Sequence, residues 1–359
     1  MTKIYIIAEA GVNHNGDADL AFKLIDVASE AGADAVKFQT FKANKLVTRK
    51  ASKAVYQSKT TNADETQYDM LKRLELDENI YVELYKYSKL KGIDFISTAF
   101  DEDSLYFLHN KLALNTLKIP SGEITNAPLL LAHAKTGSDL IVSTGMATLQ
   151  EIENALEIIA FGYLNAEDKN LKLDTCFRDA FLSREGQKYL NEKVSLLHCT
   201  TEYPAPFSEI NLTAMKTIET FFQLPVGYSD HSKGITVSIA AAAIGAKIIE
   251  KHFTLDRNMD GPDHNASIEP NELKDLVESI RIIEVCMGCG VKLPTQSEMK
   301  NINIARKSIV ANRAIKKGEK FTIDNLAIKR PGNGMAPKEY WNMLGKIAIQ
   351  DFNEDDFIK

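Results

Sequence analysis

The chain has little cysteine. Its 359 residues include four cysteines, Cys176, Cys199, Cys286 and Cys289, which do not suggest a disulfide scaffold in a chain of this length. Cys286 and Cys289 have the spacing of a redox motif, but no second pair of cysteines or histidines lies near them in the sequence. A structural zinc site needs four ligands, so we favour ordinary thiols over a metal or redox site.

Long apolar runs and basic runs are also missing. The apolar run from Ile4 to Ala10 is too short for a signal peptide or a membrane span, and no later run is long enough. The net charge is −6 and no basic stretch dominates, which argues against a nucleic-acid partner. Apolar residues make up 44% of the chain and charged residues 26%, as in ordinary globular proteins. We therefore expect a reduced, cytoplasmic protein with no membrane contact.

What the sequence does contain is two apolar stretches that each end in a histidine, at His231 and His252. Both stretches are predicted to be buried strands, separated by a short helix. If the strands are parallel neighbours, both imidazoles reach the same edge of the sheet. A lone histidine is more often a core residue, but two at adjacent strand ends favour a divalent metal site with open positions.

Strand-like and helix-like segments alternate along the first 285 residues. Glycine follows several predicted helices, as C-terminal caps do, at Gly32, Gly92 and Gly245. Eight such repeats predict an α/β fold, a (β/α)8 TIM barrel, and their even spacing favours it over a doubly wound sheet. We expect strands at 4–11, 35–40, 93–99, 116–119, 140–143, 194–199, 224–228 and 247–251.

The pattern changes after the last predicted barrel helix. We expect a catalytic barrel over residues 1–289, a linker over 290–303 and a small β-rich domain over 304–359, whose core would be limited. Two connections are unusually long. Residues 41–78 lie on the catalytic face and suit a lid or specificity loop, whereas residues 162–193 lie on the opposite face and suit a stability or oligomer role.

All eight predicted strand ends are polar, and lysines stand among them. Lys37 and Lys118 are costly to bury unless an anion pairs with them. Together with hydroxyls from Thr98, Ser121, Ser143 and Ser229, they predict a pocket for phosphate and carboxylate groups. The alternative is that the two lysines pair internally with Glu9 and Glu123. His14 and His264 are further candidates for the mouth, while His198 is expected in the core.

Several motifs in order along the chain resemble the sialic acid synthase family, the phosphoenolpyruvate-dependent nonulosonic acid synthases. They include EAGVNHNG from Glu9, KIPSGE from Lys118, HCTTEYP from His198, YSDH ending at His231, EKHF from Glu250 and KRPGNG from Lys329. The matches run from residue 4 to about residue 350. The resemblance implies a barrel followed by an antifreeze-like (SAF) domain.

In this family the small domain caps the partner subunit's active site in a domain-swapped homodimer, which implies that Arg330 is delivered in trans to the sugar. The resemblance also implies a divalent metal, Mn²⁺ with Mg²⁺ or Co²⁺ as alternatives, on His231 and His252. Glu9 and Glu123 become the acid/base and water-positioning candidates. Phosphoenolpyruvate is assigned to Lys37, Thr98, Lys118, Ser121, Ser143 and Ser229, and the sugar to Gln39, Tyr203, Asp263 and Arg330.

The sialic acid branch usually has asparagine where this chain has Thr201, and an aliphatic residue in place of Glu202. These departures make the chain more similar to the branch that produces N,N'-diacetyllegionaminic acid from 2,4-diacetamido-2,4,6-trideoxy-mannose, a sugar without a 6-hydroxyl. N-acetylneuraminate synthase, acting on N-acetylmannosamine, is the second choice, and pseudaminate synthase the third. A metal-dependent barrel hydrolase remains the alternative from another class, although it would not need the two lysines.

Overall fold

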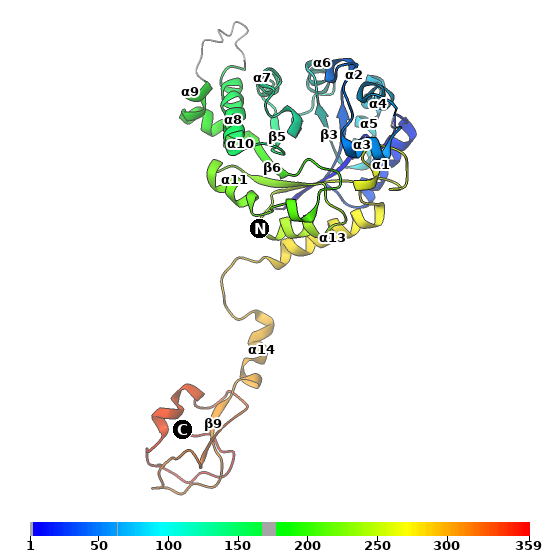
Figure 1. Ribbon diagram of the computed structural model, residues 1–359. Helices are drawn as coiled ribbons and strands as arrows, with labels where there is room; N and C mark the ends of the chain where they lie inside the picture. The colour runs from blue at the N-terminus through cyan, green and yellow to red at the C-terminus, as the bar shows by residue number, and fades with distance from the viewer. Residues whose placement is uncertain (1–2, 63, 167–176) are drawn as a thin grey trace. The chain divides into compact units, whose positions relative to one another are not determined.

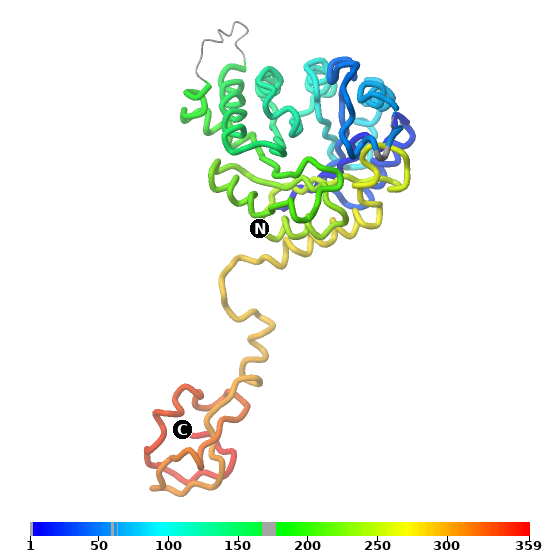
Figure 2. The backbone as a smooth tube through the Cα atoms, viewed as in Figure 1, coloured from blue at the N-terminus to red at the C-terminus, as the bar shows by residue number. Residues whose placement is uncertain are grey.

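The computed structural model describes residues 3–62, 64–166 and 177–359, and its first part is a closed barrel of eight parallel strands (Figure 1). Each strand pairs with the next, and the last returns to the first, so the two ends of the barrel sequence lie side by side (Figure 2). The predicted barrel is confirmed. Its strands are β1 (Tyr5–Gly11), β2 (Ala35–Thr40), β3 (Asp94–Ala99), β4 (Thr116–Ile119), β5 (Asp139–Ser143), β6 (Val194–Cys199), β7 (Val226–Asp230) and β8 (Ile248–His252).

The last two strands run further toward the histidines than the apolar pattern predicted. β7 continues to Asp230 rather than ending at Tyr228, and β8 includes His252. The residues added are polar but buried, because they line the mouth of the barrel or face the helices behind it. A search for apolar runs therefore ends each strand too early.

Helices surround the barrel, and their ends carry the expected caps. Asp17 accepts hydrogen bonds from the first turn of the helix that follows β1, and Thr148 does the same after β5. Gly92, at φ +70°, ends the helix before β3 in the left-handed conformation. The outer helices are α1 (Ala18–Glu30), α5 (Glu78–Lys91), α6 (Glu102–Tyr106), α7 (Ala127–Lys135), α8 (Leu149–Leu164), α11 (Ala214–Phe222), α12 (Thr236–Ala243) and α13 (Pro270–Cys286).

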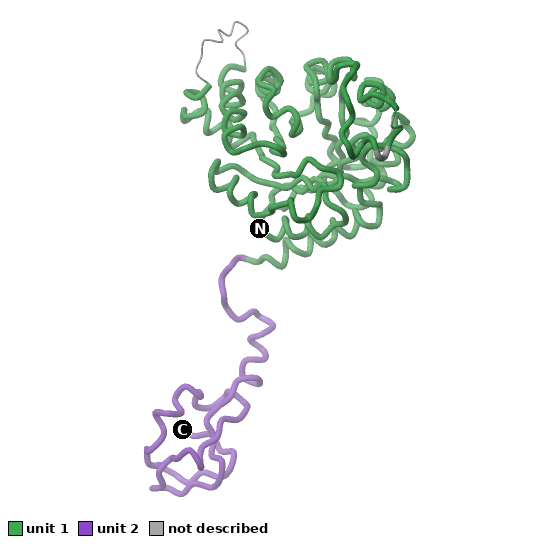
Figure 3. The backbone as a smooth tube through the Cα atoms, in the orientation of Figure 1, with its two compact units in different colours: residues 1–288 green, residues 289–359 purple. Residues whose placement is uncertain are grey.

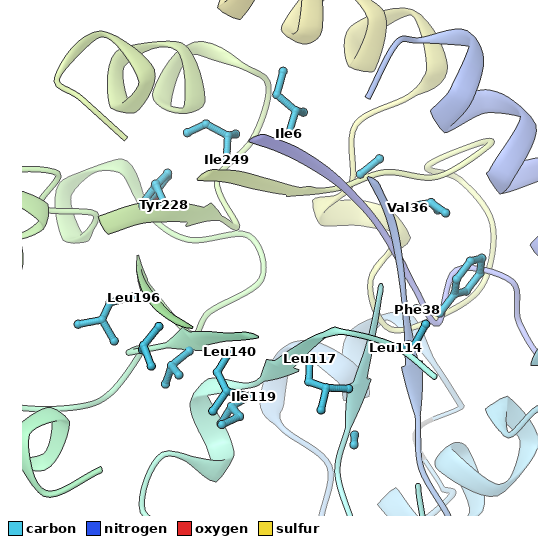
Figure 4. Close-up of a cluster of buried hydrophobic side chains, with 14 of the residues drawn as sticks. Ile6, Val36, Phe38, Leu114, Leu117, Ile119, Leu140, Leu196, Tyr228 and Ile249 are labelled. Carbon is cyan, nitrogen blue, oxygen red and sulfur yellow. The ribbon is translucent and has the colours of Figure 1, made fainter. Parts of the chain in front are cut away.

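Side-chain alternation along each strand separates two cores. Residues such as Ile6, Val36 and Ile249 face the helix layer and form the large outer core (Figure 4). Their neighbours in sequence point into the barrel, where a small apolar layer includes Ile7 and Ile248. Two residues further along, inward positions such as Glu9, Lys37 and Glu250 are polar. This change from apolar to polar layers places the chemistry at the carboxyl ends of the strands.

The long connection after β2 folds over this mouth as three short helices: α2 (Ala43–Leu46), α3 (Val55–Thr60) and α4 (Gln67–Leu74). Met70 and Leu74 of α4 are buried against Val12 and Phe41 in a separate apolar cluster. Gly16, at φ +78°, lies directly beneath α4, because a Cβ atom there would stand 2.4 Å from the carbonyl oxygen of Arg73. The segment is thus packed onto the loop that follows β1.

The other long connection lies before β6 and contributes α9 (Phe177–Leu182) and α10 (Arg184–Lys193). Both helices contact α8 on the outside of the barrel. Arg178 pairs with Glu157 of α8 at 2.8 Å and also with Glu153. Part of the predicted 162–193 segment, including Cys176, lies outside the described residues.

The chain divides into two compact units, Met1–Gly288 and Cys289–Lys359 (Figure 3). The second contains α14 (Gln296–Ala305), a two-stranded antiparallel sheet of β9 (Ser308–Ala311) and β10 (Leu326–Lys329), and α15 (Tyr340–Met343). Its own small core includes Ile309, Phe321 and Phe352. In the part of the chain that is described, no helix is both long and apolar enough to cross a membrane.

Candidate active site

A polar cavity of about 220 Å³ opens at the carboxyl ends of the barrel strands. Residues from the strands form its floor, and α4 supplies an apolar wall with Met70, Leu71 and Leu74. Tyr56 and Gln57 of α3 also line it. Most of the predicted site residues meet here. The predicted residues that line it are Glu9, Lys37, Gln39, Thr98, Lys118, Ser121, Ser143, Tyr203, Ser229, His231, His252 and Asp263.

Two buried lysines and two buried carboxylates form the centre of the floor. Lys37 Nζ lies 2.7 Å from Glu9 Oε2 and 3.7 Å from Glu250 Oε2. Lys118 Nζ lies 3.7 Å from Glu250 Oε1. The internal pairing considered from the sequence is therefore right for Lys37 and Glu9, but the partner of Lys118 is Glu250 and not Glu123. Glu250 joins the two lysines into one network.

Burial and neighbouring charges give the two carboxylates different pKa values. Burial raises the pKa of Glu9 to about 7, against the opposing effect of Lys37. Burial also acts to raise the pKa of Glu250, but Lys118 and Lys37 outweigh it and lower that pKa to about 2. Burial lowers the pKa of Lys118, while Glu250 and Glu9 raise that of Lys37. Near neutral pH Glu250 is thus a fixed negative charge and Glu9 can gain or lose a proton.

The short hydroxyls stand beside these lysines. Lys37 donates to Thr98 Oγ1 at 3.2 Å, and Lys118 donates to Ser143 Oγ at 2.6 Å. Ser229 donates to Glu250 Oε1 at 2.9 Å, and Ser121 Oγ accepts from the backbone N–H of Gly145 at 3.0 Å. Ammonium and hydroxyl donors converging on one cavity suit phosphate or carboxylate oxygens.

The two histidines face each other across adjacent strands, with ring centroids 5.6 Å apart. His231 donates from Nδ1 to the carbonyl oxygen of Thr200 at 2.6 Å, so its Nε2 lone pair can accept from the hydroxyls of Tyr203 at 3.1 Å and Ser229 at 3.3 Å or bind a metal ion. Burial lowers the pKa of His231 to about 4 and lowers that of His252, so both rings are neutral near pH 7. Neutral imidazoles in this arrangement fit a divalent metal ion.

A buried orphan atom supports the same fit. His252 Nδ1 makes no hydrogen bond to any described residue. Within the described ranges, no group of three or more His, Cys, Asp or Glu side chains is arranged to hold a metal. An ion at this place would therefore take two protein ligands and complete its shell with water or substrate.

Aromatic rings connect the histidines to the segment over the mouth. Tyr203 stacks on His231 with ring centroids 4.1 Å apart, and Tyr56 of α3 stacks on Tyr203 at 5.1 Å. Asp263 lies 4.0 Å from His252 Nδ1, and burial raises its pKa to about 6. Gln39 donates to Glu9 Oε1 at 3.4 Å. Of the four side chains assigned to the sugar, Tyr203 and Asp263 thus lie beside the histidine pair, and Gln39 lines the same cavity next to Glu9.

Other candidate residues lie elsewhere. Glu123 does not line the cavity; its carboxylate accepts a hydrogen bond from Asn126 at 2.6 Å in the turn after β4. Arg330 belongs to the second unit, where it donates to the carbonyl oxygen of Ala305. His14 and His264 are buried outside the cavity, and His264 pairs with Thr254 at 2.7 Å.

Sequence reasoning missed Glu250 as a site residue. It stands two positions before His252, so strand alternation puts both side chains on the inner face of β8. Its register partner Ser229 stands two positions before His231 in the same way. The equal spacing of these two pairs can be seen in the sequence. The contact of Glu250 with both lysines, however, depends on the closure of the barrel.

Comparisons with known proteins agree with this fold. The model of the NeuB family matches residues 24–292, and the model of the SAF domain matches residues 306–359. The chain belongs to the NeuB family and carries a C-terminal SAF domain. The resemblance found in the sequence motifs is confirmed.

Full-length relatives give finer comparisons. A Campylobacter jejuni protein named N,N'-diacetyllegionaminic acid synthase is 52% identical over 359 residues, covering 100% of both chains. A Legionella pneumophila protein of the same name is 46% identical, covering 95% of this chain and 89% of its own. A crystal structure of N-acetylneuraminic acid synthetase from Leptospira borgpetersenii superposes with a TM-score of 0.66 at 34% identity, covering 84% of this chain and 90% of that chain.

Proposed function

We propose that the protein condenses phosphoenolpyruvate with open-chain 2,4-diacetamido-2,4,6-trideoxy-mannose to give N,N'-diacetyllegionaminate and phosphate. The names of the two most similar relatives described above support the product. The single structural observation that carries the chemistry is the cavity floor, where two buried lysines and a ring of hydroxyls stand beside a neutral histidine pair. The lysines and hydroxyls suit an anion, and a metal ion on the histidine pair would suit a carbonyl group.

Phosphoenolpyruvate is assigned to the lysine side of the cavity. Lys37 and Lys118 would hold its phosphate and carboxylate, with Thr98, Ser143 and Ser121 as further donors. The enol carbon then attacks the aldehyde carbon of the sugar, water adds at C2, and phosphate leaves by cleavage of its C–O bond. These donors orient the enol ester and stabilise the phosphate that departs.

His231 and His252 are assigned as metal ligands, with Mn²⁺ the proposed ion. A divalent ion held there would polarise the sugar aldehyde as a Lewis acid. The chain's contribution is to keep both imidazoles neutral by burial and to hold His231 in one tautomer through Thr200. Tyr203 covers the face of His231 and limits the access of water.

Glu9 is the residue best placed to move a proton. Its pKa near 7 populates both protonation states, and its carboxylate contacts Lys37 and Gln39 on the cavity floor. Negative charge entering with phosphoenolpyruvate favours its protonated form. Glu123 stays the second candidate from the sequence, although it lies outside the cavity lining.

Release of inorganic phosphate tests the function. The protein would be incubated with phosphoenolpyruvate, Mn²⁺ and either 2,4-diacetamido-2,4,6-trideoxy-mannose or N-acetylmannosamine. We expect faster release with the diacetamido sugar. No release with either sugar would contradict the synthase function, and faster release with N-acetylmannosamine would contradict the choice of acceptor.

We also propose a domain-swapped homodimer in which Arg330 contacts the sugar in the partner's barrel, with residues 290–303 as the linker. Mixing subunits tests this sharply. His231→Ala and Arg330→Ala proteins should each be inactive, but a heterodimer of the two should regain activity, because one intact barrel then receives an intact Arg330. An inactive heterodimer would contradict delivery in trans.

A further inference from the structure

The residues that directly precede the two histidines form a buried ion pair. Asp230 and Lys251 are register partners on β7 and β8, with exposed fractions of 0% and 1%. Alternation turns Ser229 and Glu250 into the cavity and these two side chains outward, toward the helix layer. The pair therefore lies behind the candidate metal site and takes no direct part in it.

Every oxygen of the Asp230 carboxylate has a partner. Lys251 Nζ lies 3.2 Å from Oδ2, which also accepts from Ser238 Oγ of α12 at 2.6 Å. Oδ1 accepts from the backbone N–H and the hydroxyl of Ser232 at 2.8 and 2.7 Å. Lys251 also donates to the carbonyl oxygen of Ser232. The network joins β7, β8, α12 and the residue that follows His231.

Stability alone is a poor reason to bury such a pair. Taking two charges out of water costs about as much as their attraction returns, so apolar residues of similar volume often serve as well. Directional contacts add to the β7–β8 hydrogen-bond ladder a side-chain link between the ends of the two strands. His231 is enclosed on both sides, since its neighbours Asp230 and Ser232 are joined to each other and to Lys251.

We propose that Asp230 and Lys251 are positioning residues that hold the ends of β7 and β8 so that His231 and His252 can share one metal ion. The inference rests on the metal site of the proposed function. Two protein ligands give a site little redundancy, so the separation of the two imidazoles decides its affinity. Groups that hydrogen-bond to metal ligands typically change metal affinity by about 10- to 100-fold when they are lost, and we expect an effect of that order from a pair that fixes the backbone carrying the ligands.

The test measures Mn²⁺ binding without substrates, from the electron paramagnetic resonance signal of free Mn²⁺, together with thermal unfolding. The main variant is Asp230→Leu with Lys251→Met, which removes both charges and leaves no lone charge in the core. Arg281→Met is the matched control, because Arg281 pairs with Asp34 at 2.6 Å at the opposite end of the barrel.

We expect the double variant to bind Mn²⁺ about 10- to 100-fold more weakly than wild type, while unfolding no lower than the control. The control should keep its Mn²⁺ dissociation constant within about twofold of wild type. A double variant that binds like wild type would overturn the inference. If it fails to fold, Asp230→Asn replaces it: this variant preserves shape and the Ser232 contacts, and unchanged Mn²⁺ binding in it would equally overturn the inference.

Failure of the metal site itself has a separate signature. His231→Ala defines the binding that does not depend on the histidine pair. Wild-type protein that binds Mn²⁺ no better than His231→Ala would overturn the metal site and the inference together. Clear wild-type binding with an unaffected double variant would overturn the positioning role alone.

Discussion

Replacing Gly16 should displace α4 at the barrel mouth and thereby weaken binding of the sugar. A Cβ atom at this position would stand 2.4 Å from the carbonyl oxygen of Arg73, at the end of α4, so Gly16→Ala must displace one of the two backbones. Residues Met70, Leu71 and Leu74 of α4 form an apolar wall of the cavity. Moving α4 therefore changes the shape of the site without touching its lysines or histidines.

The expected effect of Gly16→Ala has two parts, a loss of stability and a rise in the KM for the sugar. At φ +78° an alanine costs about 1–2 kcal/mol in a left-handed conformation, which lowers the unfolding temperature by roughly 2–8 °C for a domain of this size. The contact with Arg73 adds to this and acts locally on α4. We expect the KM for the acceptor sugar to rise about tenfold, less than the roughly 100-fold that a misplacement of about 1 Å can cost, while the KM for phosphoenolpyruvate changes less than threefold.

Gly92 supplies the matched control. It has φ +70°, but a Cβ atom there meets nothing within 4 Å. Gly92→Ala should therefore show the conformational cost alone, with a similar fall in unfolding temperature and an unchanged sugar KM. The assay is phosphate release at varied sugar concentration, with thermal unfolding of both variants. Equal sugar KM values in the two variants would refute the role assigned to α4.

Three further predictions concern charge, pH and the second unit. Lys118→Met should raise the KM for phosphoenolpyruvate about 10- to 100-fold, because a charge-assisted contact is lost beside Ser143. Lys111→Met, at an exposed position, should leave this KM unchanged, and equal KM values in the two variants would contradict the anion site. Burial lowers the pKa of His133 to about 4, so the unfolded chain binds more protons than the folded chain between about pH 6.5 and 4. The free energy of unfolding therefore falls as the pH is lowered through that range, by about 2 kcal/mol at pH 5. Urea unfolding of wild type and His133→Leu at pH 7 and 5 checks this, and equal losses in both would contradict it. Ending the chain after about residue 295 should leave a folded barrel by circular dichroism with little phosphate release, since Arg330 is lost; full activity would show that the second unit is dispensable.

The sequence predicts the barrel well because its signals are local. Regular apolar segments, helix caps and glycine at Gly32, Gly92 and Gly245 each report on a few neighbouring residues. Alternation also predicts correctly that Lys37, Thr98 and Ser143 share one cavity, since parallel strands end at the same face. These inferences need no knowledge of how distant segments meet.

Inferences that depend on tertiary structure were harder. Glu123 follows the end of β4, where alternation no longer defines the direction of a side chain, and its carboxylate turns to Asn126. The close approach of Gly16 to Arg73 joins the loop after β1 to helix α4, two segments that share no local pattern. The sequence shows that both segments exist, but not that they pack against each other.

The pairing of charges on the cavity floor explains why these lysines can be buried before any substrate arrives. Lys37 and Lys118 would each be unstable alone in the barrel, and Glu250 lies within 3.7 Å of both. Because Glu250 is ionised and Glu9 has a pKa near 7, the floor can accept added negative charge by protonating Glu9 rather than by losing its lysine contacts. If phosphoenolpyruvate binds at this floor as proposed, its negative charge favours protonation of Glu9, which pairs with Lys37, while Glu250 keeps its contacts with both lysines.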